Sequence, residues 1–396
     1  MEEKNRQNRD LTVDIFRGLT IFLMIFVNDL ASVTGIPGWL KHYPPEENGM
    51  TFVDIVFPAF LFISGMSIPL ALDKRISAGE GYGTLLAGIF RRGISLLVIG
   101  VLMVNISGVN AELTGMHKYL WGTIVLLAVI MFFATVPSGR ARTIVQIISA
   151  LVILYMVYIL RSGTTENPGW MQTKWWGIIG LIGWAYLCSS LLYLLAKDNI
   201  KLIFAGVLFF LLLYMADHAG YFGEGGTAGS IIWIGVQLGS HSFIMASGMA
   251  VMLSGRELRR KNAEAHILYV YILMIILAFP AGWMLEPAYG INKNGATPSW
   301  SLYSAGWCII IFSLLRNIPF EKYGKTPAML LSFAGSNALL VYILPDIFYF
   351  LLSLSGSSIW SGAGHGTAGI IRSMLFAGVF TAAGAFLYKY KFRLHV

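Results

Sequence analysis

Polar and ionisable side chains interrupt two apolar segments near the N-terminus, residues 13–33 and 53–72. Each segment has about the 20 residues that a helix needs to cross a bilayer core of ~30 Å. Ionisable groups at membrane depth are costly, so those found there are candidates for function. The two segments share a short polar loop. The sequence therefore predicts a helical hairpin that brings Asn28, His42 and Asp54 to one end.

Three residue types at this end suit general base catalysis and the groups that support it. Histidine is the usual proton carrier at neutral pH, which makes His42 a candidate general base. Asn28 ends the first segment, where an amide can satisfy helix carbonyls or donate to a developing oxyanion. Asp54 starts the second segment, where a carboxylate can oppose the helix dipole or orient a histidine. An ordinary loop histidine fits the same pattern.

Charged residues at the other end of the hairpin suggest a different task. Asp14 and Arg17 are three residues apart and share a helix face, so a local ion pair is the simplest expectation. Arg17 together with Arg91 and Arg92 would also suit the phosphates of a nucleotide cofactor. Farther along, Asp346 lies inside an apolar segment and is a further site candidate, with pairing to Asn337 as the structural alternative.

The composition indicates what must position these residues. Of 396 residues, 56% are hydrophobic and only 12% are charged, which is typical of a polytopic membrane protein and not of a soluble domain. We expect one all-α membrane domain over residues 1–396, with the hairpin and a third helix in residues 1–105. Segment lengths predict about 12 spans, and at least 10, near residues 13–33, 53–72, 91–108, 118–136, 143–160, 176–195, 202–217, 231–254, 266–285, 300–316, 328–352 and 368–388.

Basic residues assign an orientation to these spans. With the N-terminus inside, 22 of the 28 Lys and Arg residues fall on the inner side and five on the outer side. Inner loops of membrane proteins are enriched in Lys and Arg. Both termini are therefore predicted to be cytoplasmic, and the net charge of +8 reflects topology and not a nucleic-acid partner. The mixed-charge N-terminus predicts no cleaved signal peptide. No metal-ligand spacing occurs, so no metal is expected.

A set of motifs resembles a known family. The segments are VDIFRG, MIFVN, the following loop histidine, NGMTFVDIVFPAFLFISGMSI, INKN with downstream WSL, and GSNALLVY. Together they resemble the membrane-bound heparan-alpha-glucosaminide N-acetyltransferases and their bacterial relatives, part of a superfamily of transmembrane acyltransferases. The resemblance covers residues 1–105 well and the region from about residue 240 in outline. The helix pair at 176–217 looks additional, and GMHKYLWGT stands where the family has a Gln-Arg segment.

The resemblance implies an activity and a set of roles. An acetyl group would pass from cytoplasmic acetyl-CoA, across the membrane, to the amine of a glucosamine-type sugar. His42 would be the general base or a transient acetyl carrier, with Asn28, Asp54, Asp14 and Arg17 at motif positions. Family likeness also implies a homodimer in the lipid bilayer, here of a bacterial inner membrane, with the His42 loop facing the periplasm. The acceptor sugar would meet a second family histidine and the INKN segment, which match His365, Asn292, Lys293 and Asn294.

Two other functions fit parts of the pattern. About twelve spans with buried charges also suit a secondary transporter of a small polar or sugar solute. Transporters commonly have repeated halves and broken helices, whereas the sequence shows no repeat and its polar groups gather at one face, which favours an enzyme. An acyltransferase acting on a glycan or lipid hydroxyl would keep the architecture and change only the acceptor.

Overall fold

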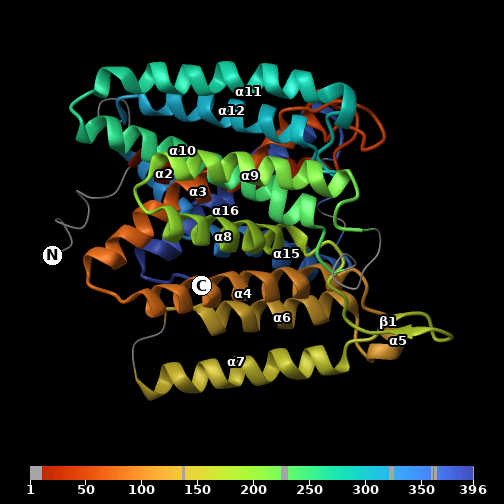
Figure 1. Cartoon of the computed structure of the whole chain (residues 1–396). Coiled ribbons are helices and arrows are strands. Elements are labelled where there is room, and N and C mark those ends of the chain that lie inside the picture. Colours follow the sequence, from red (N-terminus) through yellow and green to blue (C-terminus); the bar gives the residue numbers. More distant parts are fainter. Residues whose placement is uncertain are drawn as a thin grey trace.

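The computed structural model describes residues 11–135, 139–223, 231–320, 325–357, 360 and 364–395. These residues form a helical bundle whose long helices lie side by side in Figure 1. Within these ranges, ten helices are long and apolar enough to cross a membrane, or eleven if a bent pair counts as one span. The predicted all-α membrane bundle is therefore confirmed. Residues 1–10, from which the retained first helix was predicted, lie outside the described residues, and the side on which the termini lie stays a prediction.

The helices and the short hairpin have the following bounds. They are α2 (Leu11–Leu30), η1 (Gly38–Leu40), α3 (Val53–Ser77), α4 (Tyr82–Ile106), α5 (Ala111–Thr114), α6 (Lys118–Phe133), α7 (Arg140–Ile159), β1 (Ser162–Gly163), β2 (Pro168–Gly169), α8 (Gly177–Ala196), α9 (Ile200–His218), the π-helix η2 (Ile234–Ser240), α10 (His241–Arg260), η3 (Glu264–His266), α11 (Ile267–Tyr289), α12 (Pro298–Arg316), α14 (Lys325–Gly335), α15 (Ala338–Leu354) and α16 (Gly366–Lys389). Strands β1 and β2 pair antiparallel.

Some predicted spans differ from the structure. The predicted span 118–136 is the 16-residue helix α6, which is shorter than the ten counted above. The third helix begins at Tyr82 and not near 91, because apolar residues such as Leu85 and Ile89 precede Arg91 and Arg92, and the two arginines do not interrupt the helix. The predicted span 328–352 is broken into α14 and α15, which meet at 86°. At the break, the Asn337 amide donates to the Phe392 carbonyl at 3.0 Å and accepts from the Leu394 N–H at 3.3 Å. Asn337 therefore holds the C-terminal segment and does not pair with Asp346.

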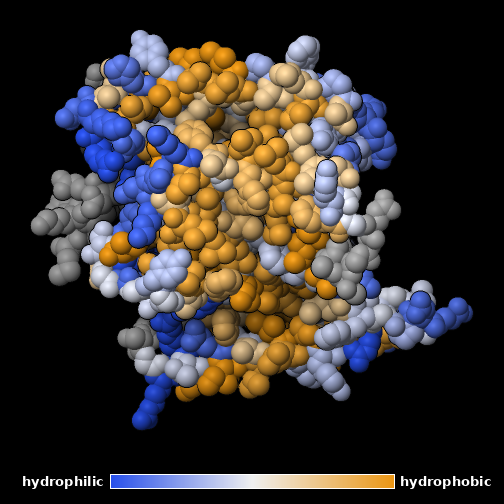
Figure 2. Space-filling view, in the orientation of Figure 1, coloured by the Kyte–Doolittle hydropathy of each residue, from blue (hydrophilic) through white to orange (hydrophobic). Residues whose placement is uncertain are grey.

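The core of the bundle is packed through glycine. A Cβ on Gly65 of α3 would lie 1.8 Å from the Met245 carbonyl oxygen of α10, and one on Gly248 would lie 2.0 Å from the Phe62 carbonyl oxygen. Small residues allow membrane helices to approach this closely. Helices α7, α9 and α11 are mostly unburied. Figure 2 shows hydrophobic residues across the middle of the molecule and hydrophilic ones toward its two ends, as expected of a membrane protein.

The two ends of the bundle are named here by α2 and α3. The histidine end is where α2 ends and α3 begins, and it carries the loop between Leu30 and Val53. The basic end is where α2 begins and α3 ends. The predicted pair at 176–217 is present as α8 and α9, and α8 packs against α4, with Gly180 close to the backbone of Gly100.

Candidate functional site

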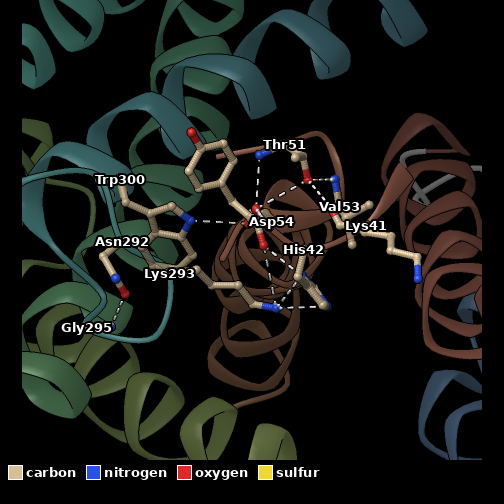
Figure 3. Close-up of polar contacts among 10 residues, drawn as sticks. Lys41, His42, Thr51, Val53, Asp54, Asn292, Lys293, Gly295 and Trp300 are labelled. Atoms are coloured by element: carbon tan, nitrogen blue, oxygen red, sulfur yellow. Dashed lines mark hydrogen bonds and ion pairs between the residues drawn. The ribbon is translucent and has the colours of Figure 1, made fainter. Parts of the chain in front are cut away.

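His42 and Asp54 form a hydrogen-bonded pair at the histidine end (Figure 3). The His42 Nδ1 atom lies 2.7 Å from Asp54 Oδ1. The Asp54 side chain is 2% exposed and the His42 side chain 41% exposed, so the buried carboxylate holds a ring that is open to solvent. The carboxylate only accepts, which assigns the ring proton to Nδ1 and leaves Nε2 as the proton-accepting atom.

The local sequence explains why Asp54 is held so firmly. Its Oδ2 atom accepts the N–H groups of Thr51 at 2.9 Å and Tyr43 at 3.1 Å, and Thr51 Oγ1 accepts the Val53 N–H at 3.2 Å. The T-x-x-D segment at the start of α3 thus makes a variant of the capping box, in which the Thr51 hydroxyl accepts from Val53 and the Asp54 carboxylate accepts from Thr51. Asp54 therefore lies in the first turn of α3 with one oxygen bound to backbone N–H groups and the other to His42.

Lys293 is the third member of this centre. Its Nζ atom lies 3.1 Å from Nδ1 and 3.3 Å from Nε2 of His42, and 4.0 Å from Asp54 Oδ1. Burial lowers the pKa of the Lys293 ammonium below the ordinary lysine value, although the Asp54 charge opposes this effect. An amine nitrogen thus lies within or close to hydrogen-bond distance of the candidate base.

The loop that carries Lys293 is fastened to the loop that carries His42. The Asn292 amide donates to the Pro45 carbonyl at 2.5 Å, and its oxygen accepts the Gly295 N–H at 2.8 Å. Asn48 Oδ1 accepts the Ile291 N–H at 2.5 Å. Asn292 therefore positions Lys293 and has little capacity left to bind a ligand, whereas Asn294 is exposed.

A large cavity opens at the basic end. Its volume is about 2000 Å³, and its walls come from α2, α3, α4, α8, α10, α14, α15, α16 and the C-terminal segment. Arg17 lines it and bonds to Asp14 at 3.0 Å and to Ser67 at 2.5 Å, so the predicted local ion pair exists inside the cavity wall. Arg91 is not among the lining residues. The described cationic lining residues are Arg17, Lys74, Arg92, Arg256, Lys389, Lys391 and Arg393.

The cavity extends along α3 toward the His42–Asp54 pair. Phe60 is the lining residue of α3 nearest to Asp54, and Phe57 lies between them in the sequence. From Phe60 to Asp54 is about 9 Å along a helix. The Phe57 ring packs edge-on against the His241 ring at 5.5 Å. Nearly two helical turns therefore separate the lining residue Phe60 from Asp54.

Helix α2 presents a matching face. Asp14, Arg17, Ile21 and Met24 line the cavity at helical spacing, and Asn28 follows four residues later. Asn28 is exposed and makes no side-chain hydrogen bond among the described residues, so its amide is not joined to His42. Its position on the lined face of α2 leaves the amide available.

The neighbouring Asp29 has the opposite environment. It is 3% exposed and accepts from the Arg372, Ser373 and Trp360 side chains at 3.1, 2.6 and 3.1 Å, and also from the Tyr349 hydroxyl. Asp29 thereby ties the end of α2 to α15 and α16. This buried network had no predicted counterpart, because the partners of Asp29 lie 320 to 344 residues away in the sequence.

The remaining predicted residues lie apart from His42. The His365 ring lies over Gly35, and the Thr34 N–H donates to the Gly364 carbonyl at 2.9 Å, which holds His365 at the histidine end. Asp346 lies on α15 four residues beyond Tyr342, a lining residue of the cavity, and has no hydrogen bond or ion pair in the described ranges. Neither is brought into contact with the His42–Asp54 pair.

Several site residues were not predicted. The T-x-x-D pattern was a sequence signal for Thr51. No local pattern indicates Trp300, whose indole N–H donates to the Asp54 carbonyl at 3.3 Å from 246 residues away. The cavity cations Lys74, Arg256 and Lys389 looked like ordinary charges of inner loops. No cluster of three or more His, Cys, Asp or Glu that would suit a metal occurs in the described part of the chain.

Comparison with known proteins gives partial matches. The heparan-alpha-glucosaminide N-acetyltransferase of Mus musculus is 32% identical over 176 residues, which are 42% of this chain and 24% of that protein. The Homo sapiens protein of the same name is 40% identical over 95 residues, 24% of this chain and 13% of the relative. The matches thus span a quarter or less of these relatives, and the predicted resemblance is confirmed as a distant one. Residues 9–233 match the family described as "Domain of unknown function (DUF5009)", and since this is more than half of the chain, the chain belongs to that family.

Proposed function

We propose that this protein is a membrane-bound acetyltransferase that carries an acetyl group from acetyl-CoA at the basic end to an amino-sugar amine at the histidine end. One observation carries the proposal. A cavity rich in cations begins at the basic end and stops about 9 Å along α3 from a histidine–carboxylate pair at the other. A phosphate-bearing donor with a long arm needs that arrangement, because its charged part and its reacting group must lie at opposite ends.

The cavity wall suits the phosphates of the donor. Arg17 and Arg256 are paired with Asp14 and Asp73, which leaves Arg92, Lys74 and the C-terminal cations without a carboxylate partner among the described residues. The Arg92 guanidinium lies over the Tyr186 ring at 4.9 Å. The Arg393 guanidinium lies over the Tyr388 ring at 3.8 Å, and its buried Nε has no hydrogen-bond partner in the described ranges. Guanidinium groups bind phosphate in bidentate geometry.

The His42–Asp54 pair suits the amine. An amine attacks a thioester only when it is unprotonated, so a base must lie within hydrogen-bond reach of the acceptor. His42 Nε2 accepts this proton, and Asp54 stabilises the imidazolium that forms. Asn28, on the lined face of α2, is the proposed donor to the oxyanion. Direct transfer and a transient acetyl group on His42 are both compatible with this geometry.

The acceptor is proposed to be an amine rather than a hydroxyl. The Lys293 Nζ atom lies 3.1 and 3.3 Å from the two ring nitrogens, so a nitrogen fits against the base. Heparan-alpha-glucosaminide N-acetyltransferase, the name of both relatives, also points to a glucosamine amine. Asn294, His365 and Asp346 are proposed to contact the sugar. A homodimer in a bacterial inner membrane, with the His42 loop facing the periplasm, belongs to the same proposal.

One structural feature favours a transporter as the second candidate. Broken helices commonly form transporter binding sites. The break between α14 and α15 contributes Gly335, Ser336 and Asn337 to the cavity wall. The sequence evidence against a transporter was the absence of a repeat and the gathering of polar groups at one face, and the broken pair α14–α15 is a feature on the transporter side.

The deciding experiment uses purified protein in sealed proteoliposomes with radiolabelled acetyl-CoA. Glucosamine is offered as the acceptor and glucose as its hydroxyl-only counterpart. We expect N-acetylglucosamine from the wild type and none from His42→Ala, whereas His218→Ala, an exposed histidine at the same end, should be active. Uptake of labelled glucosamine without acetyl-CoA would support the transporter instead. Near-normal turnover by His42→Ala would exclude the proposed mechanism.

A further inference from the structure

Lys293 occupies the place that the acceptor amine needs. A general base acts on a group within about 2.6–3.2 Å, or through one water. Lys293 Nζ lies 3.1 Å from Nδ1 and 3.3 Å from Nε2 of His42. Since the His42 Nδ1–H donates to Asp54, the ring nitrogen left to accept a proton is Nε2, and Lys293 competes for it with any acceptor.

We propose that Lys293 is itself an acetylation site, modified by the protein's own centre when acetyl-CoA is bound and no amino sugar is present. The inference rests on the proposed function. In the step, His42 Nε2 takes a proton from the Lys293 ammonium, and Nζ bonds to the thioester carbonyl carbon. The carbon–sulfur bond then breaks, the thiolate leaves as CoA and is protonated by the imidazolium, and a second proton is lost from nitrogen to solvent. The products are Nε-acetyllysine and CoA, with no other reactant.

The loop geometry makes this amine a better target than other lysines at the histidine end. The clamp by Asn292 and Asn48 fixes the Lys293 backbone against the His42 loop. In Figure 3 the Lys293 side chain reaches toward His42, whereas that of Lys41 leads away from it. Lys174 Nζ instead donates to the Val104 carbonyl at 3.2 Å. Burial lowers the pKa of the Lys293 ammonium, which increases the fraction that is nucleophilic.

Modification would switch the centre off. An acetylated Lys293 has no charge, and its acetyl group lies beside Nε2 of His42. Because Lys293 is part of the chain, the acetylated product cannot dissociate from the site as an acetylated sugar would. The competing role is a permanent ammonium that balances the Asp54 charge across 4.0 Å. A permanent counter-ion would stay unmodified, so the two roles predict different chemistry for the same atom.

The test incubates purified wild-type protein with deuterated acetyl-CoA and no sugar. Peptide mass spectrometry then follows labelling of Lys293, with Lys41 and Lys174 as internal controls. We expect label on Lys293 and not on the controls, labelling about 100-fold slower in His42→Ala, and protection by glucosamine. Transfer to glucosamine, assayed on the same samples, should fall in proportion to Lys293 occupancy.

The outcomes separate this inference from the proposed function. If glucosamine is acetylated while Lys293 stays unlabelled, the self-acetylation site is wrong and the proposed function stands. If neither nucleophile is labelled, both are wrong. Equal labelling of all three lysines, or labelling that persists in His42→Ala, indicates nonspecific chemistry and also overturns the inference. Preincubation with acetyl-CoA should lower the rate of transfer to glucosamine in the wild type but not in Lys293→Arg.

Discussion

Replacing Asp54 by Asn tests the histidine–carboxylate pair most directly, because it removes one charge at nearly constant size. Asp54 Oδ2 is held by the N–H groups of Thr51 at 2.9 Å and Tyr43 at 3.1 Å. The amide in Asp54→Asn has a single oxygen, and it must take the place of Oδ2 to accept these two N–H groups. The new NH₂ group therefore takes the place of Oδ1 and faces His42. It then donates to Nδ1, the ring proton moves to Nε2, and the base is lost.

The size of the effect follows from two contributions. A hydrogen bond to a charged group is worth about 1.5–3 kcal/mol, or roughly 10- to 150-fold in rate. The wrong tautomer costs more, about 10⁴-fold where a serine protease triad is altered in the same way. We therefore expect Asp54→Asn to lower kcat by about 10²- to 10⁴-fold. The KM for acetyl-CoA should hardly change, because the cavity cations lie at the other end.

The assay is acetyl transfer to glucosamine, with gel filtration and thermal unfolding to show that each variant folds. Glu286→Gln is the matched control. Glu286 accepts from Asn48 at 3.1 Å and from Tyr303 at 3.4 Å at the same end of the bundle, and has no contact with His42 among the described residues. An Asp54→Asn enzyme within tenfold of wild type, or as impaired as Glu286→Gln, would refute this reasoning.

Three further predictions concern the cavity, Lys293 and the core. Arg92→Ala should raise the KM for acetyl-CoA about tenfold, whereas Arg91→Ala, outside the cavity lining, should not; equal KM values would contradict the phosphate role. Burial lowers the pKa of the Lys293 ammonium, so Lys293 loses its proton at a pH below the usual lysine range. As the pH rises, the Lys293 ammonium no longer competes for His42 Nε2, and the rate should increase. Lys293→Met should therefore flatten any alkaline rise in the rate, and an unchanged pH profile would exclude this competition. Gly65→Ala places a Cβ 1.8 Å from a backbone oxygen and should destabilise the protein by about 1–3 kcal/mol in thermal unfolding. Gly378→Ala, with nothing within 4 Å, should not, so equal melting temperatures would show that α3 and α10 can separate.

The sequence predicted where the helices occur better than where they are broken. Apolar length identified the segments because each buries its backbone groups within one helix. It could not show the break between α14 and α15, because that break depends on Asn337 bonding to residues 392 and 394. Local composition carries no information about such a distant contact.

The residues of the candidate site also fall into a group that the local sequence predicts and a group that it does not. The His42–Asp54 pair was predictable, since both residues flank one short loop and T-x-x-D marks a helix start. Lys293 is 251 residues from His42, and only the family resemblance pointed to it. Successive helical residues point about 100° apart. That rotation directs Asn28 along the cavity face and Asp29 into the core, and the periodicity of Asp14, Arg17, Ile21 and Met24 would have distinguished them.

The dimensions of α3 bear on the choice between enzyme and transporter. From Lys74 to Asp54 is about 30 Å along the helix, and the cavity lines about 21 Å of it, up to Phe60. A donor bound in the cavity would therefore extend over about 21 Å of the ~30 Å that separate Lys74 from Asp54 along α3. Only the acetyl end must pass the turn that carries Phe57. We infer that acetyl transfer needs local movement at Phe57 and not the alternating exposure of a whole solute site, so the bent α14–α15 pair serves as cavity wall.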